Sequence, residues 1–175
     1  RAAEGQITVA DIITLRKDAM RVNYARDKVK AGQSTPTEVP FGFKTGRQRV
    51  SGKLHPAVRG RLEKIYGYEV KIIDENTFEV LYPGEVAARA NLEKLVEVVN
   101  SMIRMKRSAE EIVAFAVQDL LIIHAFADGN GRSARLFGQI LYKKLTGKTV
   151  IFPRIFHREM DFSVLDLTTA LQNPR

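Results

Sequence analysis

The chain has 175 residues, of which 45% are hydrophobic and 27% are charged, with a net charge of +8 and no cysteine. These proportions are typical of a globular domain, and the missing cysteines exclude disulfides, thiol nucleophiles and cysteine-bound zinc. No apolar run has transmembrane length and no signal-peptide pattern opens the chain, so we expect one domain over residues 1–175 without a membrane partner. Because the sequence starts at Arg1, we expect this domain to be excised from a longer protein.

The positive charge lies in the first part of the chain. Residues 1–64 hold 14 Lys and Arg against 6 Asp and Glu, whereas residues 65–175 hold 14 of each kind. A basic segment of this sort is compatible with a nucleic acid or an acidic protein as a partner. The charges are scattered, however, and do not alternate with aromatic residues as in a base-stacking platform. We therefore expect a solvated basic surface, with an acidic partner as the alternative and nucleic acid disfavoured.

The first part of the chain is predicted to hold two helices separated by a long loop. Thr8 to Ala31 has a broad apolar face, and Thr8 with Asp11 resembles a capping box. Residues 32–52 are rich in Ser, Thr, Pro and Gly, which predicts a loop. Pro56 at a first helical position predicts a short helix that ends near Gly67.

A β-hairpin and further helices are predicted for the remainder. Tyr68 to Leu81 alternates apolar and polar residues around a turn at 74–76, which predicts the hairpin. Helices are expected over 86–106, over 109–123 behind a capping box at Ser108, and over 132–146. A last amphipathic helix is expected from about His157 to Leu171. The fold class is therefore mainly α, a compact helical domain with one small β-hairpin.

Twelve residues between two of these helices, from His124 to Arg135, read His-Ala-Phe-Ala-Asp-Gly-Asn-Gly-Arg-Ser-Ala-Arg. Gly129 and Gly131 allow a tight turn and a close backbone approach to a ligand. A turn that leads into a helix presents free N–H groups to an anion, and Arg132 and Arg135 add donors suited to phosphate oxygens. The turn therefore predicts a phosphate-binding site.

Two other side chains add chemistry to this turn. His124 is a residue type suited to act as a base near neutral pH, and Asp128 is a hard oxygen ligand of the kind that Mg²⁺ takes beside substrate phosphates. Alternatively, His124 would be a helix-end histidine kept charged by the helix dipole, and Asp128 a simple helix cap. Phe126 is expected to anchor the loop in the core. Together the segment predicts a site that holds a polyphosphate and deprotonates a group beside it.

The same segment resembles the signature of the Fic (filamentation induced by cAMP) family, H-x-F-x-[DE]-G-N-G-R-x-x-R. Every fixed position is met, and Ala125 replaces the common Pro after the His. The resemblance is strongest over 124–135 and looser over a core of about 68–147. It implies a Fic fold and a protein adenylyltransferase (AMPylator), which transfers AMP from ATP to a Ser, Thr or Tyr hydroxyl of a target protein and releases pyrophosphate.

The resemblance also implies a role for each residue of the motif. His124 would be the general base, and Asp128 would bind the Mg²⁺ that bridges the phosphates of ATP. Arg135 would hold the γ-phosphate, and Gln139 would lie near the base or ribose. The remaining phosphate-binding positions are Gly129, Asn130, Gly131 and Arg132.

The predicted hairpin corresponds in position to the family's flap, which clamps a target segment by strand pairing. A purely stabilising role is the alternative. The flap residues expected to dock the target are Ile72, Ile73, Asp74, Glu75, Asn76, Thr77 and Phe78.

An inhibitory segment is expected at residues 1–6. Many relatives carry the pattern [ST]-x-x-x-E-[GN], whose Glu pairs with the second arginine, here Arg135. Glu4-Gly5 fits the end of that pattern, although its Ser/Thr position would precede Arg1; the alternative is a solvated terminus. The match at Ser34 to Glu38 is poorer, and His55 and His157 are expected to be ordinary histidines.

Alternatives remain open for the group transferred. Relatives with altered motifs transfer phosphate, UMP or phosphocholine. Asp128 and Arg132 argue against the phosphate-transferring Doc branch, which has Lys at the second of these positions. The sequence does not identify the residues that contact the base, so UMP or another nucleotide remains an alternative. Outside the enzymes, the alternative is a non-catalytic basic binding module. The need for ATP favours a cytoplasmic location, or a host cytosol if the chain is part of a secreted effector.

Overall fold

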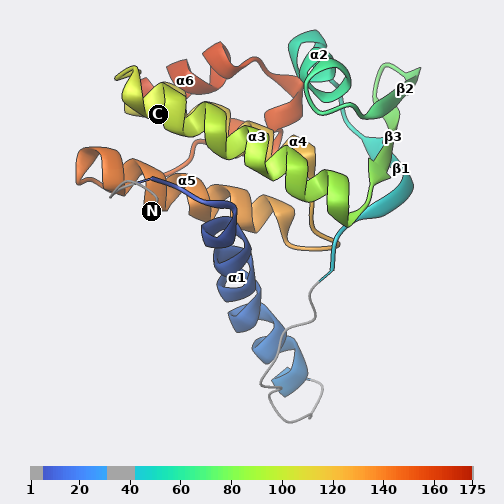
Figure 1. The fold of residues 1–175 in the computed structure, drawn as a ribbon, viewed down its shortest axis with the longest axis horizontal. Helices are drawn as coiled ribbons and strands as arrows, with labels where there is room; N and C mark the ends of the chain where they lie inside the picture. Colours follow the sequence, from blue (N-terminus) through green and yellow to red (C-terminus); the bar gives the residue numbers. More distant parts are fainter. Residues whose placement is uncertain (1–5, 31–41, 175) are drawn as a thin grey trace.

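A computed structural model describes residues 6–30 and 42–174, and for residues 22–30 it describes the backbone alone. Within these ranges the fold is mainly helical with a small sheet at one end (Figure 1), which confirms the predicted fold class. The elements are α1 (Val9–Lys30), β1 (Thr45–Ser51), α2 (Pro56–Lys64), β2 (Glu69–Asp74), β3 (Thr77–Pro83), α3 (Glu85–Arg104), α4 (Ala109–Ile123), α5 (Asn130–Thr146), the 3₁₀ turns η1 (Arg154–His157) and η2 (Glu159–Asp161), and α6 (Val164–Gln172).

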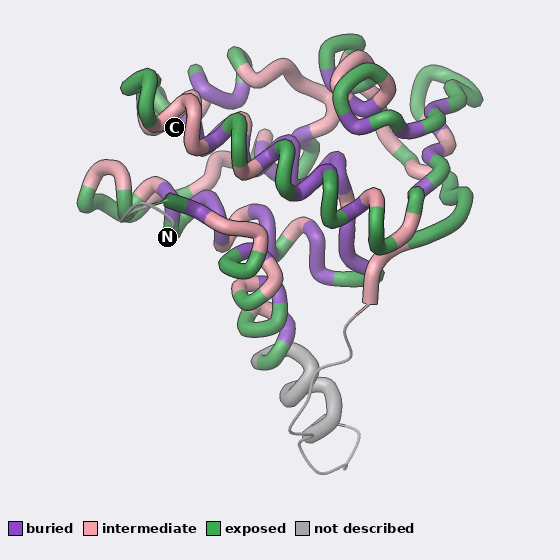
Figure 2. Tube along the Cα trace, viewed as in Figure 1, coloured by how far each residue is buried: buried purple, intermediate pink, exposed green. Residues whose placement is uncertain are grey.

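Helix α4 is the centre of the core. Every residue from Ile112 to Ile123 except Phe115 is buried, because α3, α5 and α6 pack around it (Figure 2). A helix that is apolar on all sides is stable only when its whole circumference is covered. Helix α5 approaches α4 closely at Gly138, where an added Cβ would lie 2.4 Å from Cγ2 of Val117. This contact fixes the two helices that flank the motif.

The sheet has the order β1-β3-β2, and both pairings are antiparallel. The predicted hairpin is confirmed as β2 and β3, whose buried residues Phe78, Val80 and Tyr82 alternate along β3. The prediction of a loop over residues 32–52 was wrong for β1. This strand reads Thr-Gly-Arg-Gln-Arg-Val-Ser and is exposed except at half-buried Val50, so it has no apolar alternation that could reveal it. Its pairing with β3 makes it a strand.

The predicted caps are confirmed in part. The Thr8 N–H donates to Asp11 Oδ2 at 2.8 Å and the Asp11 N–H donates to Thr8 Oγ1 at 3.2 Å, which completes that capping box. Ser108 accepts a bond from the Glu111 N–H at 3.2 Å. The Glu111 carboxylate instead binds Arg107 at 2.6 Å, so the capping box expected at Ser108 is incomplete.

The end of the chain departs from the prediction of one helix between His157 and Leu171. Two 3₁₀ turns come first, and α6 begins only at Val164 behind a capping box formed by Ser163 and Asp166. The turn η2 is held against α4 by Gln118, whose Nε2 donates to the carbonyl oxygens of Glu159 at 2.6 Å and Phe162 at 2.8 Å. A side chain from α4 therefore decides where this segment lies.

No helix in the described ranges is both long enough and apolar enough to cross a membrane.

Candidate functional site

The motif residues enclose a cavity of about 320 Å³, which we call the anion cavity. It lies where the end of α4, the loop 124–129 and the start of α5 meet the segment before β1. It is lined by Lys44, His124, Ala127, Asp128, Gly129, Asn130, Gly131, Arg132 and Arg135. The structure thus brings together every predicted motif residue from His124 to Arg135 that was assigned a chemical role.

His124 follows the last residue of α4 in a left-handed conformation, with φ 48° and ψ 44°. Its Nδ1 lies 3.1 Å from the Leu121 carbonyl oxygen. Since a carbonyl only accepts, the neutral ring carries its proton on Nδ1 and has Nε2 as the basic nitrogen. Burial and the nearby Lys44 ammonium lower the pKa of His124 to about 4. This direction of the pKa shift disfavours the alternative of a histidine kept charged by the helix dipole.

Lys44 is a residue of the cavity that the sequence did not reveal. Its N–H donates to the Ala125 carbonyl oxygen at 2.8 Å, and Phe43 forms a β-bridge with Phe126. Its Nζ lies 5.0 Å from the centroid of the Tyr82 ring, which in turn lies 5.5 Å from the His124 ring. Burial lowers the pKa of Lys44, whereas Asp128 opposes that shift. No local pattern could connect residue 44 with a histidine eighty positions later.

Asp128 is exposed to the cavity, and its Oδ1 accepts a bond from the Gly129 N–H at 2.6 Å. It is the single carboxylate among the lining residues, and the described ranges hold no cluster of three or more His, Cys, Asp or Glu that could bind a metal. Mg²⁺ is commonly held by one or two carboxylates together with substrate phosphates and water. The donor set therefore fits Mg²⁺ that is bound jointly with phosphate oxygens.

Helix α1 braces this loop from outside. Arg16 is 2% exposed, and its Nε donates to the Asp128 carbonyl oxygen at 3.3 Å. Its guanidinium also lies 5.9 Å from the centroid of the Phe126 ring, which is buried as predicted for a loop anchor. Sequence reasoning did not single out Arg16, because its contact with the loop spans more than one hundred residues.

The turn into α5 combines a left-handed glycine with an internal brace. Gly129 has φ 81°, and an added Cβ would lie 2.4 Å from Met20 Sδ. Asn130 Oδ1 accepts from the Phe126 N–H at 3.0 Å, and its Nδ2 donates to the Phe126 carbonyl oxygen at 2.7 Å. The Asn130 side chain is thus engaged within the loop, and a phosphate-binding role would fall to its backbone amide. Amides in the first turn of a helix have no acceptor inside the helix.

The two arginines differ in their surroundings. Arg132 is exposed at the rim of the cavity, whereas Arg135 is half-buried. Nη1 of Arg135 lies 3.4 Å from Glu159 Oε1 and 3.4 Å from the Phe156 carbonyl oxygen. Glu159 was missed because its segment was assigned to a helix. Gln139 is exposed on α5 outside the lining of the anion cavity, so the structure does not bring it into the site.

Arg135 also lines a second cavity of about 330 Å³, which we call the neighbouring cavity. Apolar side chains from α4, the sheet and the turn η2 meet there with basic and acidic ones. Its lining residues are Ser51, Gly52, Lys53, Phe78, Leu121, Arg135, His157, Arg158, Glu159, Met160 and Asp161.

The hairpin tip lies away from His124. The Gly52 N–H donates to the Asn76 carbonyl oxygen at 2.7 Å. Pro56 and Arg59 of α2 line a pocket together with the hairpin residues Ile72, Asp74, Glu75, Thr77 and Phe78. Phe78 is buried and lines the neighbouring cavity. Strand β1, by contrast, begins next to Lys44 at the anion cavity and ends at Ser51, beside the neighbouring cavity. Strand β1 therefore runs along the site beside β3, which carries Tyr82 next to His124.

The expected flap residues are placed individually as follows: Ile72, Ile73, Asp74, Glu75 and Asn76 are exposed, Thr77 is half-buried, and Phe78 is buried. Glu4 and the weaker match at residues 34–38 lie outside the described residues.

Comparisons with known proteins bear on this site. Searches among curated proteins and among solved structures found no match. The model of the Fic/DOC family matches residues 7–142, which is well over half of the chain and includes the whole motif around the anion cavity. The chain therefore belongs to the Fic/DOC family.

Proposed function

We propose that the chain is a protein adenylyltransferase, which transfers AMP from ATP to a Ser, Thr or Tyr hydroxyl of a target protein. Members of its family are generally transferases that move a nucleotide or another phosphate-containing group to proteins. The observation that carries the proposal is the placement of His124 at the anion cavity, with Nδ1 3.1 Å from the Leu121 carbonyl oxygen, which leaves Nε2 as the basic nitrogen. A neutral imidazole with a basic Nε2 lies beside a cavity lined by helix-start amides and two arginines.

The proposed reaction follows from these positions. Nε2 of His124 accepts the proton of the target hydroxyl, and the oxygen attacks the α-phosphorus of ATP. The bond between the α-phosphorus and the bridging oxygen breaks, and pyrophosphate leaves. The amides at the start of α5, with Arg132 and Arg135, stabilise the negative charge on the phosphates. Asp128 would hold Mg²⁺ together with phosphate oxygens, and such an ion neutralises charge that develops on the leaving group.

The neighbouring cavity is the proposed place for the nucleoside. It shares Arg135 with the anion cavity, and Phe78, Leu121 and Met160 offer apolar surface to a base. In this arrangement the triphosphate of one ATP molecule lies in the anion cavity and its nucleoside lies beyond Arg135. Arg135 would then contact the phosphates nearer the ribose instead of the γ-phosphate expected from the resemblance. The lining of the neighbouring cavity is compatible with adenine and with uracil. The experiment must therefore distinguish AMP transfer from UMP transfer.

The proposed docking edge for the target is β1. Among the described strands β1 pairs only with β3, so its second edge is open for an added strand. A segment paired there would run from the anion cavity toward the neighbouring cavity and could hold a hydroxyl near His124. Arg47 and Arg49 on this strand favour an acidic segment, although both already pair with Glu79.

This docking edge can be tested by labelling a cell lysate from α-labelled ATP. Arg49→Glu should weaken labelling of target proteins while leaving ATP binding intact. Ile73→Ser at the hairpin tip is the matched control, because its side chain is exposed on β2, the strand on the other side of β3. If Ile73→Ser alone reduces labelling, the hairpin tip is the docking site.

The experiment that tests the activity is intact mass measurement after incubation with Mg²⁺ and each nucleoside triphosphate in turn. We expect AMP to be added with ATP, on the protein itself or on a substrate protein, and nothing to be added by His124→Ala. Addition of UMP instead would correct the nucleotide. A folded protein that adds nothing, yet binds nucleic acid with a steep salt dependence, would support the binding module.

A further inference from the structure

We infer that Glu159 is a positioning residue of this site: its buried carboxylate holds one side of the Arg135 guanidinium so that the other side faces the anion cavity. This inference rests on the proposed function, because it assumes that phosphates bind in that cavity.

The contacts of Arg135 are one-sided. The two hydrogen bonds described above, to Glu159 and to the Phe156 carbonyl, both leave from Nη1. A guanidinium carries five N–H donors in a rigid plane, so in the part of the chain that the structure describes Nε and Nη2 are the donors left for a ligand. A Cβ added to Gly131 would lie 3.4 Å from both Nη1 and Nη2. The guanidinium therefore lies between the phosphate turn and the segment that carries Glu159.

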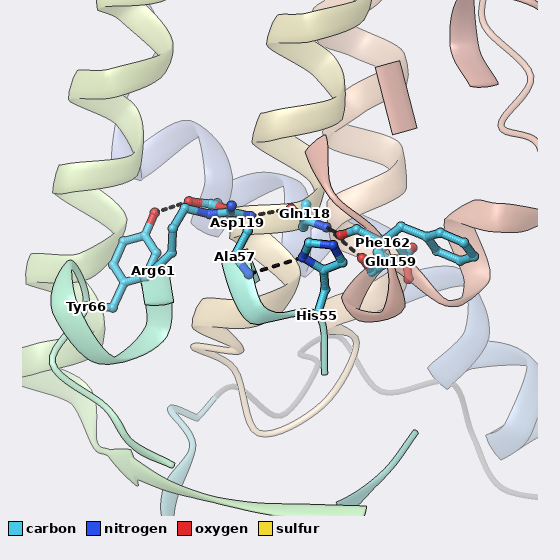
Figure 3. A network of polar contacts seen from close by, with 8 residues as sticks. All are labelled: His55, Ala57, Arg61, Tyr66, Gln118, Asp119, Glu159 and Phe162. Atoms are coloured by element: carbon cyan, nitrogen blue, oxygen red, sulfur yellow. Dashed lines mark hydrogen bonds and ion pairs between the residues drawn. The ribbon is translucent and has the colours of Figure 1, made fainter. Parts of the chain in front are cut away.

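Glu159 itself is firmly placed. It is 3% exposed, and its carbonyl oxygen accepts the bond from Gln118 Nε2 at 2.6 Å. Gln118 is fully buried on α4 and also binds Arg61, which forms a 2.9 Å ion pair with Asp119 (Figure 3). The same helix thus ends at His124 and, through Gln118, places the carboxylate that holds Arg135. Helix α4 therefore sets the positions of both His124 and Arg135.

The opposite interpretation makes a different prediction. A carboxylate that acts only as a negative charge near phosphates, or that competes with them for Arg135, would weaken anion binding by repulsion. Removing it would then tighten binding. If Glu159 positions Arg135, removing it frees the side chain to sample other rotamers, and binding weakens. The two interpretations therefore differ in the sign of the effect.

The decisive experiment is calorimetric titration with inorganic tripolyphosphate and with ATP. We expect Glu159→Ala to raise Kd about tenfold, the size expected for losing a hydrogen bond to a charged group. Glu159→Gln retains an amide oxygen that can accept from Nη1 and should raise Kd by only about two- to threefold. Because the glutamine is nearly isosteric, it also keeps the proposal testable if the alanine variant does not fold.

Asp161→Asn is the matched control. Asp161 lines the neighbouring cavity two residues further along but pairs with Arg158 at 2.5 Å instead of Arg135. The control removes a negative charge from the cavity proposed for the nucleoside, so it is measured with tripolyphosphate, which has no nucleoside. The Kd for tripolyphosphate should stay unchanged or fall slightly. A double-mutant cycle completes the test: in an Arg135→Ala background, Glu159→Ala should no longer weaken binding.

The outcomes separate this inference from the proposed function. Equal or tighter binding of tripolyphosphate by both Glu159 variants, in a protein that still transfers AMP, would overturn the inference alone. Weaker binding by these variants, in a wild type that transfers no nucleotide, would support the inference and reject the transfer reaction. Failure of the wild type to bind either probe would reject both.

Discussion

The unusual acidity of the His124 imidazolium gives the sharpest prediction. Burial and Lys44 lower its pKa from 6.5 to about 4. A general base acts only when it is unprotonated, so the pKa of the free enzyme sets the acid limb of kcat/KM. With a pKa of about 4, about 97% of the imidazole is neutral at pH 5.5, compared with about 9% for an ordinary histidine. We therefore expect activity to persist at pH 5.5.

The Lys44 ammonium is the second cause of the lowered pKa of His124. Lys44→Met removes this charge and keeps much of the aliphatic chain. Loss of the ammonium should raise the pKa of His124, so the acid limb should move toward neutral pH. The pKa should stay below 6.5 because burial, the larger cause, is unchanged. Lys53→Met is the matched control, since it removes one positive charge from the neighbouring cavity and should shift the limb less.

The same shift makes a prediction about stability. As the pH falls below 6.5, the unfolded chain binds a proton at this residue before the folded protein does. The contribution of neutral His124 is therefore complete above pH 6.5 and is lost progressively as the pH falls toward about 4. The full loss is about 3 kcal/mol. His124→Gln should lack this component, so unfolding in urea at pH 7.5 and at pH 4.5 should show a smaller difference for the variant.

Two assays check the reasoning. The chain has three histidines, so proton NMR of the free protein can follow each ring, with His55→Gln and His157→Gln assigning the other two signals. Single-turnover transfer of label from ATP gives kcat/KM over the same pH range. An inflection of the His124 signal near pH 6.5, accompanied by an acid limb at the same pH, would refute the electrostatic account.

The remaining predictions concern the phosphate turn and its metal. Gly129→Ala should lower the free energy of unfolding by about 1–2 kcal/mol or more in urea titrations, because the added Cβ is strained at φ 81° and collides with Met20. Asn130→Ala should cost about 2–3 kcal/mol in the same measurement, because it leaves the buried N–H and carbonyl of Phe126 unpaired. Asp128→Asn keeps an oxygen that can accept from the Gly129 N–H, so the fold should persist. The Mg²⁺ concentration for half-maximal transfer should rise, because a carboxylate ligand is lost. An unchanged Mg²⁺ dependence would mean that Asp128 serves only as a helix cap.

Local patterns were sufficient for most of the secondary structure and for the chemistry of the motif. Helices α4 and α5 are marked by apolar periodicity, by Ser108 before one and by Gly147 after the other, and these signals depend only on residues a few positions apart. The order of residues from His124 to Arg135 likewise ensures that a base, a carboxylate and two arginines meet at one turn. These helix signals and the order of the motif depend only on neighbouring residues, so they can be recognised without a structure.

Tertiary packing decided the rest, because each feature depends on residues far apart in the chain. Strand β1 exists through its pairing with β3, and its own residues show no strand pattern. Lys44 reaches the cavity through a bond to Ala125, and its charge, together with burial, lowers the pKa of His124 and so favours the neutral base over the charged alternative. Glu159 meets Arg135 because Gln118 holds its carbonyl against α4. The sequence alone thus determined which groups are present at the site, whereas long-range contacts determined their charge states and partners.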